Sequence, residues 1–133
     1  MTQQNGNNNE IGMNRVVPIL RMFDVALTKQ FYIDFLGFRL DWEHRFEDGF
    51  PLYMQVSYGD CRLHLSEHFG DASPGSAVRI EVEGIAAFHA KLHERPYKYA
   101  RPGLEKKPWD SAEVSVQDPS GNRLHFFESD KEE

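Results

Sequence analysis

Cysteine, long apolar runs and positive charge are all scarce in this sequence, and each shortage excludes a class of protein. Cys61 is the single cysteine among 133 residues, so the chain can form no internal disulfide. We interpret Cys61 as a small strand residue and expect a reducing, cytoplasmic location. No apolar run approaches the roughly 18 residues of a membrane-spanning helix, and the amino-terminal residues lack a signal-peptide pattern. The sequence therefore predicts no membrane association.

The balance of charges argues against a nucleic-acid-binding protein. The chain has 15 Lys and Arg residues against 21 Asp and Glu residues, a formal net charge of -6 at pH 7. Phosphate-binding surfaces need clustered basic side chains, and the only adjacent basic pair is Lys106-Lys107. The phosphate-binding loop and the glycine-rich dinucleotide fingerprint are also missing. We therefore expect no nucleic-acid partner and no nucleotide cofactor.

The chain does contain enough apolar material for one domain. Apolar residues make up 40% of the sequence and aromatic residues 13%, and a chain of this length can bury a sizeable core. Residues 1–14 are rich in Asn and Gln and predict a flexible tail. Residues 129–133 predict a short charged tail. The sequence between them, residues 15–128, predicts a single domain.

Two similar halves follow one another within that domain. Residues 61–67 alternate as a half-buried strand, with leucines on one face and His64 on the other. Residues 122–128 repeat this pattern about 60 positions later, with His125 in the place of His64. We therefore predict a duplicated module, and the two copies are expected at residues 16–67 and 77–128.

Each half is expected to run in the order strand, helix and three further strands. Helices are predicted at residues 25–35 and 85–94, because apolar residues recur there at helical spacing. Asp24 suits the N-cap of the first helix and Gly37 suits its C-cap. The strands are predicted at residues 16–22, 38–46, 51–58, 61–67, 77–82, 99–104, 112–117 and 122–128.

A tight turn and a helix signature connect this pattern with a known family. Asp118-Pro119-Ser120-Gly121-Asn122 is a turn sequence, because its proline presets φ and its glycine and asparagine tolerate left-handed φ. With Phe31-Tyr32, Leu36-Gly37-Phe38 and the paired modules, it resembles the vicinal oxygen chelate superfamily. That superfamily includes glyoxalase I, extradiol dioxygenases and the bleomycin resistance proteins. Over residues 16–128 the resemblance implies an α+β fold, in which two βαβββ modules form a cupped half-barrel with the ligand on its concave side.

Within the superfamily, the chain is most similar to the bleomycin resistance branch. Three segments carry this likeness, namely Val17-Pro18-Ile19-Leu20, Pro108-Trp109, and Leu124-His125-Phe126 after the turn. Proteins of this branch sequester the drug without altering it and exchange an amino-terminal strand between two subunits. The resemblance therefore implies a homodimer that sequesters a bleomycin-type antibiotic, with no catalytic residue.

Metal separates this branch from the enzymes of the superfamily. The resemblance places the four ligand positions of those enzymes at Val17, His64, Ala77 and His125. At two of these positions, valine and alanine have no lone pair to donate. A catalytic metal site needs about three protein ligands, so we expect no metal cofactor. A metal-dependent glyoxalase-like lyase or dioxygenase stays open as the alternative, since Glu81 or Glu113 could supply a ligand from another position.

Aromatic and acidic side chains on the concave face form the basis of the binding hypothesis. Planar ligands stack on aromatic rings, and carboxylates attract a cationic tail. Burial of the same aromatic residues in the core is the competing interpretation. The expected ligand is a planar or cationic small molecule such as bleomycin. It is expected to contact Trp42, Phe46, Tyr53, His64, Trp109, Glu113, His125 and Phe127.

One further pair of histidines lies outside these strands. His89 and His93 are one helical turn apart in the predicted helix 85–94. This spacing can chelate a metal ion, but we interpret the pair as part of an exposed helix face.

Overall fold

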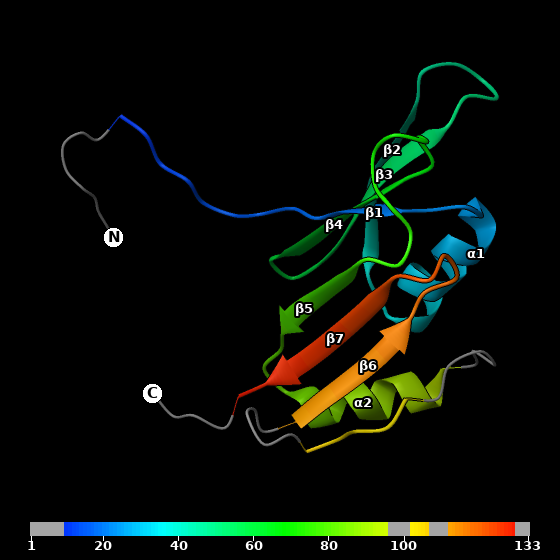
Figure 1. The fold of residues 1–133 in the computed structure, drawn as a ribbon. Coiled ribbons are helices and arrows are strands. Elements are labelled where there is room, and N and C mark those ends of the chain that lie inside the picture. Colours follow the sequence, from blue (N-terminus) through cyan, green and yellow to red (C-terminus); the bar gives the residue numbers. More distant parts are fainter. Residues whose placement is uncertain (1–9, 96–101, 107–111, 130–133) are drawn as a thin grey trace.

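The computed structural model describes residues 10–95, 102–106 and 112–129, which form two similar units (Figure 1). The first unit consists of β1 (Ile19–Arg21), α1 (Val25–Lys29), η1 (Gln30–Phe35), β2 (Arg39–Arg45), β3 (Leu52–Tyr58) and β4 (Cys61–Ser66). The second unit consists of β5 (Ala77–Glu81), α2 (Ile85–Glu94), β6 (Ala112–Gln117) and β7 (Arg123–Glu128). None of the helices in these ranges is long and apolar enough to cross a membrane. These elements confirm the predicted α+β fold, although the described part of the second unit has two strands after its helix and not the predicted three.

Each unit contains one sheet in which the first strand lies beside the last. The first sheet has the order β1-β4-β3-β2, and the second has the order β5-β7-β6. β1 runs parallel to β4 and β5 runs parallel to β7, whereas the hairpin strands are antiparallel. Ile19 lies opposite His64, and Arg79 lies opposite His125. The two histidines therefore hold equivalent places, which confirms the predicted duplication.

The core lies on the helix side of both sheets, as the alternating patterns predicted. α2 packs against β6 and β7, and η1 packs against β2. Side chains at every second strand position point to this side, where burial of apolar surface stabilises the fold. The buried strand residues of this face include Leu63, Leu65, Val114, Val116, Leu124 and Phe126, with Val78, Ile80 and Val82 packed against them.

The first helical segment follows the predicted span 25–35 but changes its hydrogen-bond pattern halfway. The Asp24 carboxylate caps α1 by accepting from the Leu27 amide at 2.9 Å. The chain then continues as the π-helix η1, and the Leu36 amide donates to the Phe31 carbonyl at 2.9 Å. Four large side chains of this segment face the core. These fully buried side chains are Phe31, Tyr32, Phe35 and Leu36.

Gly37 ends this segment, as predicted, with a φ of +88° that favours glycine. The Arg95 guanidinium, from the end of α2, donates to the Phe35 carbonyl at 2.9 Å. A Cβ at Gly37 would lie only 2.8 Å from Nη1 of Arg95. The second unit therefore caps the first helical segment, and glycine leaves room for the arginine that does so.

The strand expected at residues 16–22 is shorter than predicted and spans only Ile19–Arg21. Pro18 has no N–H to donate to the ladder. Its carbonyl accepts the last bond, from the His64 amide at 2.9 Å. The ladder therefore stops at the proline, and the chain before it is unpaired in this sheet.

Residues 10–16 run away from the two units as an extended segment (Figure 1). Ile11, Met13 and Val16 within it are 82%, 91% and 87% exposed. The other parts of the predicted tails, residues 1–9 and 130–133, lie outside the described residues.

The strand expected at residues 99–104 is wrong in its described part. Residues 99–101 lie outside the described residues, and residues 102–104 belong to no strand. Instead, Glu105 forms an isolated antiparallel bridge to Glu113, with N–O distances of 2.9 and 2.8 Å. An isolated bridge is a single residue pair, so the two-residue alternation that predicts a strand does not reveal it.

The predicted turn at residues 118–122 is present, and its polar residues Asp118, Ser120 and Asn122 are buried. The Asp118 carboxylate accepts from the backbone amides of Ser120 and Asn122, each at 2.9 Å. It also accepts from the Asn122 side chain at 2.9 Å and from the Tyr32 hydroxyl of η1 at 2.7 Å. Burial, together with the Asp118 charge, raises the pKa of Tyr32 well above its usual value, so the phenol keeps its proton.

The same turn also binds the start of the first unit. The Asn122 side chain donates to the Arg21 carbonyl at 2.8 Å, and the Phe23 amide donates to the Ser120 hydroxyl at 3.0 Å. We call the bonds of residues 118–122 to Tyr32, Arg21 and Phe23 the turn clasp. Because it joins residues about a hundred positions apart, the clasp holds the two units together.

Candidate functional site

The outer face of the first sheet, opposite the core, carries three rings in mutual contact. Trp42 in β2 stacks on Tyr53 in β3, with ring centroids 6.0 Å and ring planes 9° apart. His64 in β4 meets both rings edge-on, 5.3 Å from Trp42 and 5.1 Å from Tyr53. We call these three residues the aromatic cluster. Trp42 remains 43% exposed, so the cluster offers a flat apolar surface to a ligand.

A chain of hydrogen bonds fixes the His64 ring and its tautomer. The Gln55 side-chain amide donates to the Asp41 carboxylate at 2.9 Å, which leaves the Gln55 carbonyl oxygen 2.9 Å from His64 Nε2. A carbonyl oxygen only accepts, so Nε2 carries the proton and Nδ1 accepts from the Tyr53 hydroxyl at 2.8 Å. Burial lowers the pKa of His64, which favours the neutral imidazole at neutral pH.

Asp41 belongs to this network although the sequence did not single it out. The pairing of β2 with β3 shifts between Leu40 and Trp42, so Asp41 is the extra residue of a β-bulge. Strict alternation from the core-facing Leu40 would turn Trp42 toward the core, and the bulge turns it to the outer face. Hydrogen bonds from Gln55 and Ser57 hold the pKa of Asp41 below its usual range. Its carboxylate is therefore ionised at neutral pH.

The outer face of the second sheet carries a buried carboxylate between two basic side chains. Glu113 in β6 is 6% exposed and lies 3.4 Å from Nη1 of Arg79 and 3.3 Å from Nδ1 of His125. The Ser115 hydroxyl lies 2.8 Å from the same histidine nitrogen. The Arg79 guanidinium covers the Phe127 ring, 4.2 Å from its centroid. We call Arg79, Glu113, His125 and Phe127 the charged cluster.

The structure therefore brings the predicted residues together in two groups. Trp42, Tyr53 and His64 form one group, and Glu113, His125 and Phe127 form the other. Arg79 is the member of the second group that the predicted contact list omitted, and its place on the alternating strand β5 opposite His125 was the available signal.

Two predicted contact residues are not placed in either group by the structure. Phe46 follows the end of β2, where it is 72% exposed and packs on Phe50 with ring centroids 5.8 Å apart. Trp109 lies outside the described residues.

Of the four positions that the resemblance assigns to metal ligands, two carry histidines, one in each cluster, and the other two carry Val17 and Ala77. His64 and His125 each lie in a hydrogen-bonded network, while Val17 and Ala77 contribute no donor atom. Glu113 does approach His125, as the off-pattern alternative required. Among the described residues, however, no group of three His, Cys, Asp or Glu side chains is placed to hold a metal ion.

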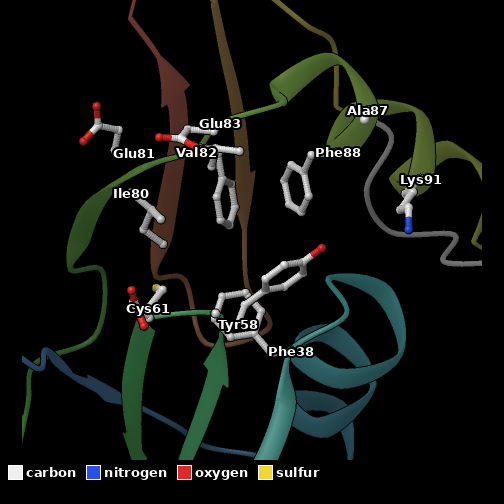
Figure 2. A pocket seen from close by; sticks show the side chains of 13 residues that line it. Phe38, Tyr58, Cys61, Ile80, Glu81, Val82, Glu83, Ala87, Phe88 and Lys91 are labelled. Carbon is white, nitrogen blue, oxygen red and sulfur yellow. The ribbon is translucent and has the colours of Figure 1, made fainter.

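A separate cavity lies between the two units on the core side. Two residues connect β3 with β4, whereas residues 118–122 connect β6 with β7. The longer turn reaches η1 and forms the clasp, and beside the shorter turn there is a cavity of about 500 Å³. Figure 2 shows Tyr58 and Phe38 of the first unit on one side of it and Phe88 of α2 on the other. Its apolar walls are formed by Phe38, Tyr58, Ile80, Val82, Phe88 and Phe126.

The protein therefore consists of two similar units, each with a histidine at the equivalent place on the outer face of its sheet. This arrangement defines a protein built from a duplicated module. The chain belongs to the glyoxalase superfamily, because the family model described as "Glyoxalase superfamily protein" matches residues 2–133. The superfamily predicted from the turn and helix signatures is thereby confirmed.

Several similar proteins are named as bleomycin resistance or bleomycin-binding proteins. The Bleomycin resistance protein of Geobacillus stearothermophilus is 30% identical over 137 residues, which cover 90% of this chain and 99% of the relative. The Bleomycin resistance protein of Staphylococcus aureus matches to the same extent. The bleomycin-binding protein of Streptomyces verticillus, solved with copper(II)-bleomycin, is 30% identical with a TM-score of 0.64, and the match covers 90% and 99% of the two chains. TnmS3, an antibiotic-binding protein from Streptomyces sp. CB03234, shares the fold at 20% identity, with a TM-score of 0.69 and the same coverage.

Proposed function

We propose that this protein binds a bleomycin-type antibiotic and sequesters it without chemical modification. The main support is the aromatic cluster, in which a half-exposed indole is stacked on Tyr53 and braced by a hydrogen-bonded His64. A ring system held in place in this way can stack a planar ligand without first being ordered. Relatives of nearly the same length carry the name of bleomycin resistance proteins, and one was solved with the copper(II) complex of the drug.

The charges near the aromatic cluster suit a ligand that is both planar and cationic. Asp41 lies directly before Trp42 and is ionised, since hydrogen bonds lower its pKa, and its Oδ1 is paired with the Arg39 guanidinium at 2.9 Å. The net charge of -6 adds a weak, salt-screened attraction for cations. We propose that the planar part of the ligand stacks on Trp42 and Tyr53 while a cationic part approaches Asp41. Glu113, His125 and Phe127 are proposed to contact another part of the ligand, and Phe46 and Trp109 are kept as proposed contacts.

We infer that the protein acts as a homodimer, because its extended amino-terminal segment exposes apolar side chains to water. Burial of these side chains against a second subunit would stabilise the dimer. Light scattering at micromolar concentration is expected to give about twice the 15.4 kDa mass of one chain. Ile11→Asp together with Met13→Asp should shift the protein toward monomer. Leu27→Asp, a change on α1 at a side chain that is 40% exposed, is the control and should leave the mass unchanged. A monomeric mass for the unaltered chain would contradict the inference.

The binding proposal predicts that metal-free bleomycin binds this protein with a measurable calorimetric signal. Trp42→Ala is expected to weaken binding by about 1–2 kcal/mol, or roughly five- to thirtyfold, because one stacked face is lost. Isothermal titration calorimetry is the suitable measurement, since it does not depend on the fluorescence of the residue that is removed.

Tyr58→Ala is the matched control for this measurement. Tyr58 is 46% exposed, close to the value for Trp42, but it lines the cavity between the units instead of the sheet face. Unchanged affinity for Tyr58→Ala and weaker affinity for Trp42→Ala would support the sheet-face site. The reverse result would place the drug in the cavity, and no heat at saturating bleomycin would remove the proposed ligand altogether.

A further inference from the structure

The outer side of α2 carries two histidines whose rings converge on one backbone atom. His89 and His93 are half-buried, and their ring centroids are 4.5 Å apart. Nε2 of His89 lies 3.1 Å from the Pro102 carbonyl oxygen, and Nε2 of His93 lies 2.7 Å from the same oxygen. Both rings therefore aim the same nitrogen at one point, which an ordinary exposed helix face does not require. The interpretation of this pair as a solvated face is incomplete, since the segment at Pro102 covers it.

The two distances from Nε2 of His89 and His93 to the Pro102 oxygen are close to those between neighbouring ligand atoms of a tetrahedral metal site. Zinc binds imidazole nitrogen and oxygen at about 2.0–2.2 Å, which places neighbouring ligand atoms roughly 3.3 Å apart in a tetrahedron. The observed separations of 3.1 and 2.7 Å need only a small opening to reach this value. Imidazole is a good ligand for zinc, copper and nickel, and histidines one helical turn apart present their nitrogens on one side of a helix.

We propose that His89, His93 and the Pro102 carbonyl bind a divalent transition metal of the zinc class, with water as the fourth ligand. On binding, the proton that each Nε2 donates to the Pro102 carbonyl moves to Nδ1, so that an unprotonated Nε2 faces the metal. This change between the two tautomers of the imidazole needs no other reactant. The site involves neither His64 nor His125 and does not depend on the proposed antibiotic function.

A metal at this place would strengthen the edge of the second sheet. The segment 102–106 continues from Pro102 to Glu105, whose backbone bridges Glu113 in β6. Glu113 is the central carboxylate of the charged cluster on the outer face. Metal binding would thus join α2 to the segment that covers β6 and restrain the strand that carries Glu113. The metal is structural in this role and takes part in no chemical step.

Titration of the full chain with zinc chloride, followed by calorimetry, tests the site. One equivalent is expected to bind, and His89→Asn or His93→Asn should weaken binding by more than about tenfold, because loss of even an outer partner of a ligand costs that much. His44→Asn, on an exposed residue of β2, and His64→Asn are the controls and should leave the affinity unchanged. Zinc should also perturb the imidazole NMR signals of His89 and His93 in the unaltered protein, which keeps the test independent of how the variants fold. Absence of zinc binding, or zinc binding lost in His64→Asn and kept without His89 and His93, would overturn the proposal.

Discussion

Replacing Asp118 by alanine should lower the free energy of unfolding by roughly 3–5 kcal/mol, as measured by urea or guanidinium denaturation. The change removes an acceptor that serves two backbone amides, the Asn122 side chain and the Tyr32 hydroxyl. Asp118 is 4% exposed, so the donors left behind are largely kept from water. Each buried donor that loses its partner costs about 1–3 kcal/mol, and partial relaxation reduces the sum.

Two further variants show whether this loss belongs to the turn clasp. Tyr32→Phe removes a single clasp bond and should cost about 1 kcal/mol. Asp34→Ala removes an exposed carboxylate from the neighbouring η1 and should change stability by less than about 0.5 kcal/mol. If Asp118→Ala proved as mild as Asp34→Ala, the clasp would not be what holds the two units together.

Leu124→Ala should destabilise the protein by about 2–5 kcal/mol without directly altering the ligand surface. Leu124 is fully buried in β7, the central strand of the second sheet, and its side chain packs in the core. Shortening it leaves a cavity that paired strands on both sides cannot close. Denaturation measures the loss, and bleomycin titration at a temperature where the variant is folded should give an affinity near that of the unaltered protein.

His125→Ala is the counterpart on the next residue of the same strand. Its side chain points to the outer face, where it contacts Glu113 and Ser115. The substitution should cost less than about 1 kcal/mol of stability while weakening bleomycin binding. The opposite pair of results, a stable Leu124→Ala and an unstable His125→Ala, would mean that the two faces of β7 are assigned the wrong way round.

Much of the fold was accessible from the sequence because it rests on local periodicity. Leucines and valines at every second position placed Leu63, Leu124 and Val114 in the core, and the same rule put His64 and His125 on the outer faces. The repeat of about 60 residues predicted two modules. The cap at Asp24 and the glycine at Gly37 set the limits of the first helix through their own backbone chemistry.

The site was less accessible, because its geometry depends on departures from periodicity. The outward direction of Trp42 follows from the bulge at Asp41, and a bulge is seen only once the partner strand is paired. Trp109, one of the residues on which the branch resemblance rests, lies outside the described residues. Arg79 joins the charged cluster because β5 lies beside β7, a parallel pairing between distant segments.

The sequence by itself determined the order of the first module, the turn at residues 118–122, the faces of β4 and β7, and the superfamily. Only the tertiary structure decided what the turn does, since its bonds to Tyr32 and Arg21 span 86 and 101 positions of the chain. The same is true of the early end of β1 at Pro18 and of the two histidines of α2 that meet the Pro102 carbonyl. Local patterns record the periodicity of a residue's own helix or strand. Contacts between distant segments depend on how the helices and strands pack together, and that packing is settled by the core as a whole.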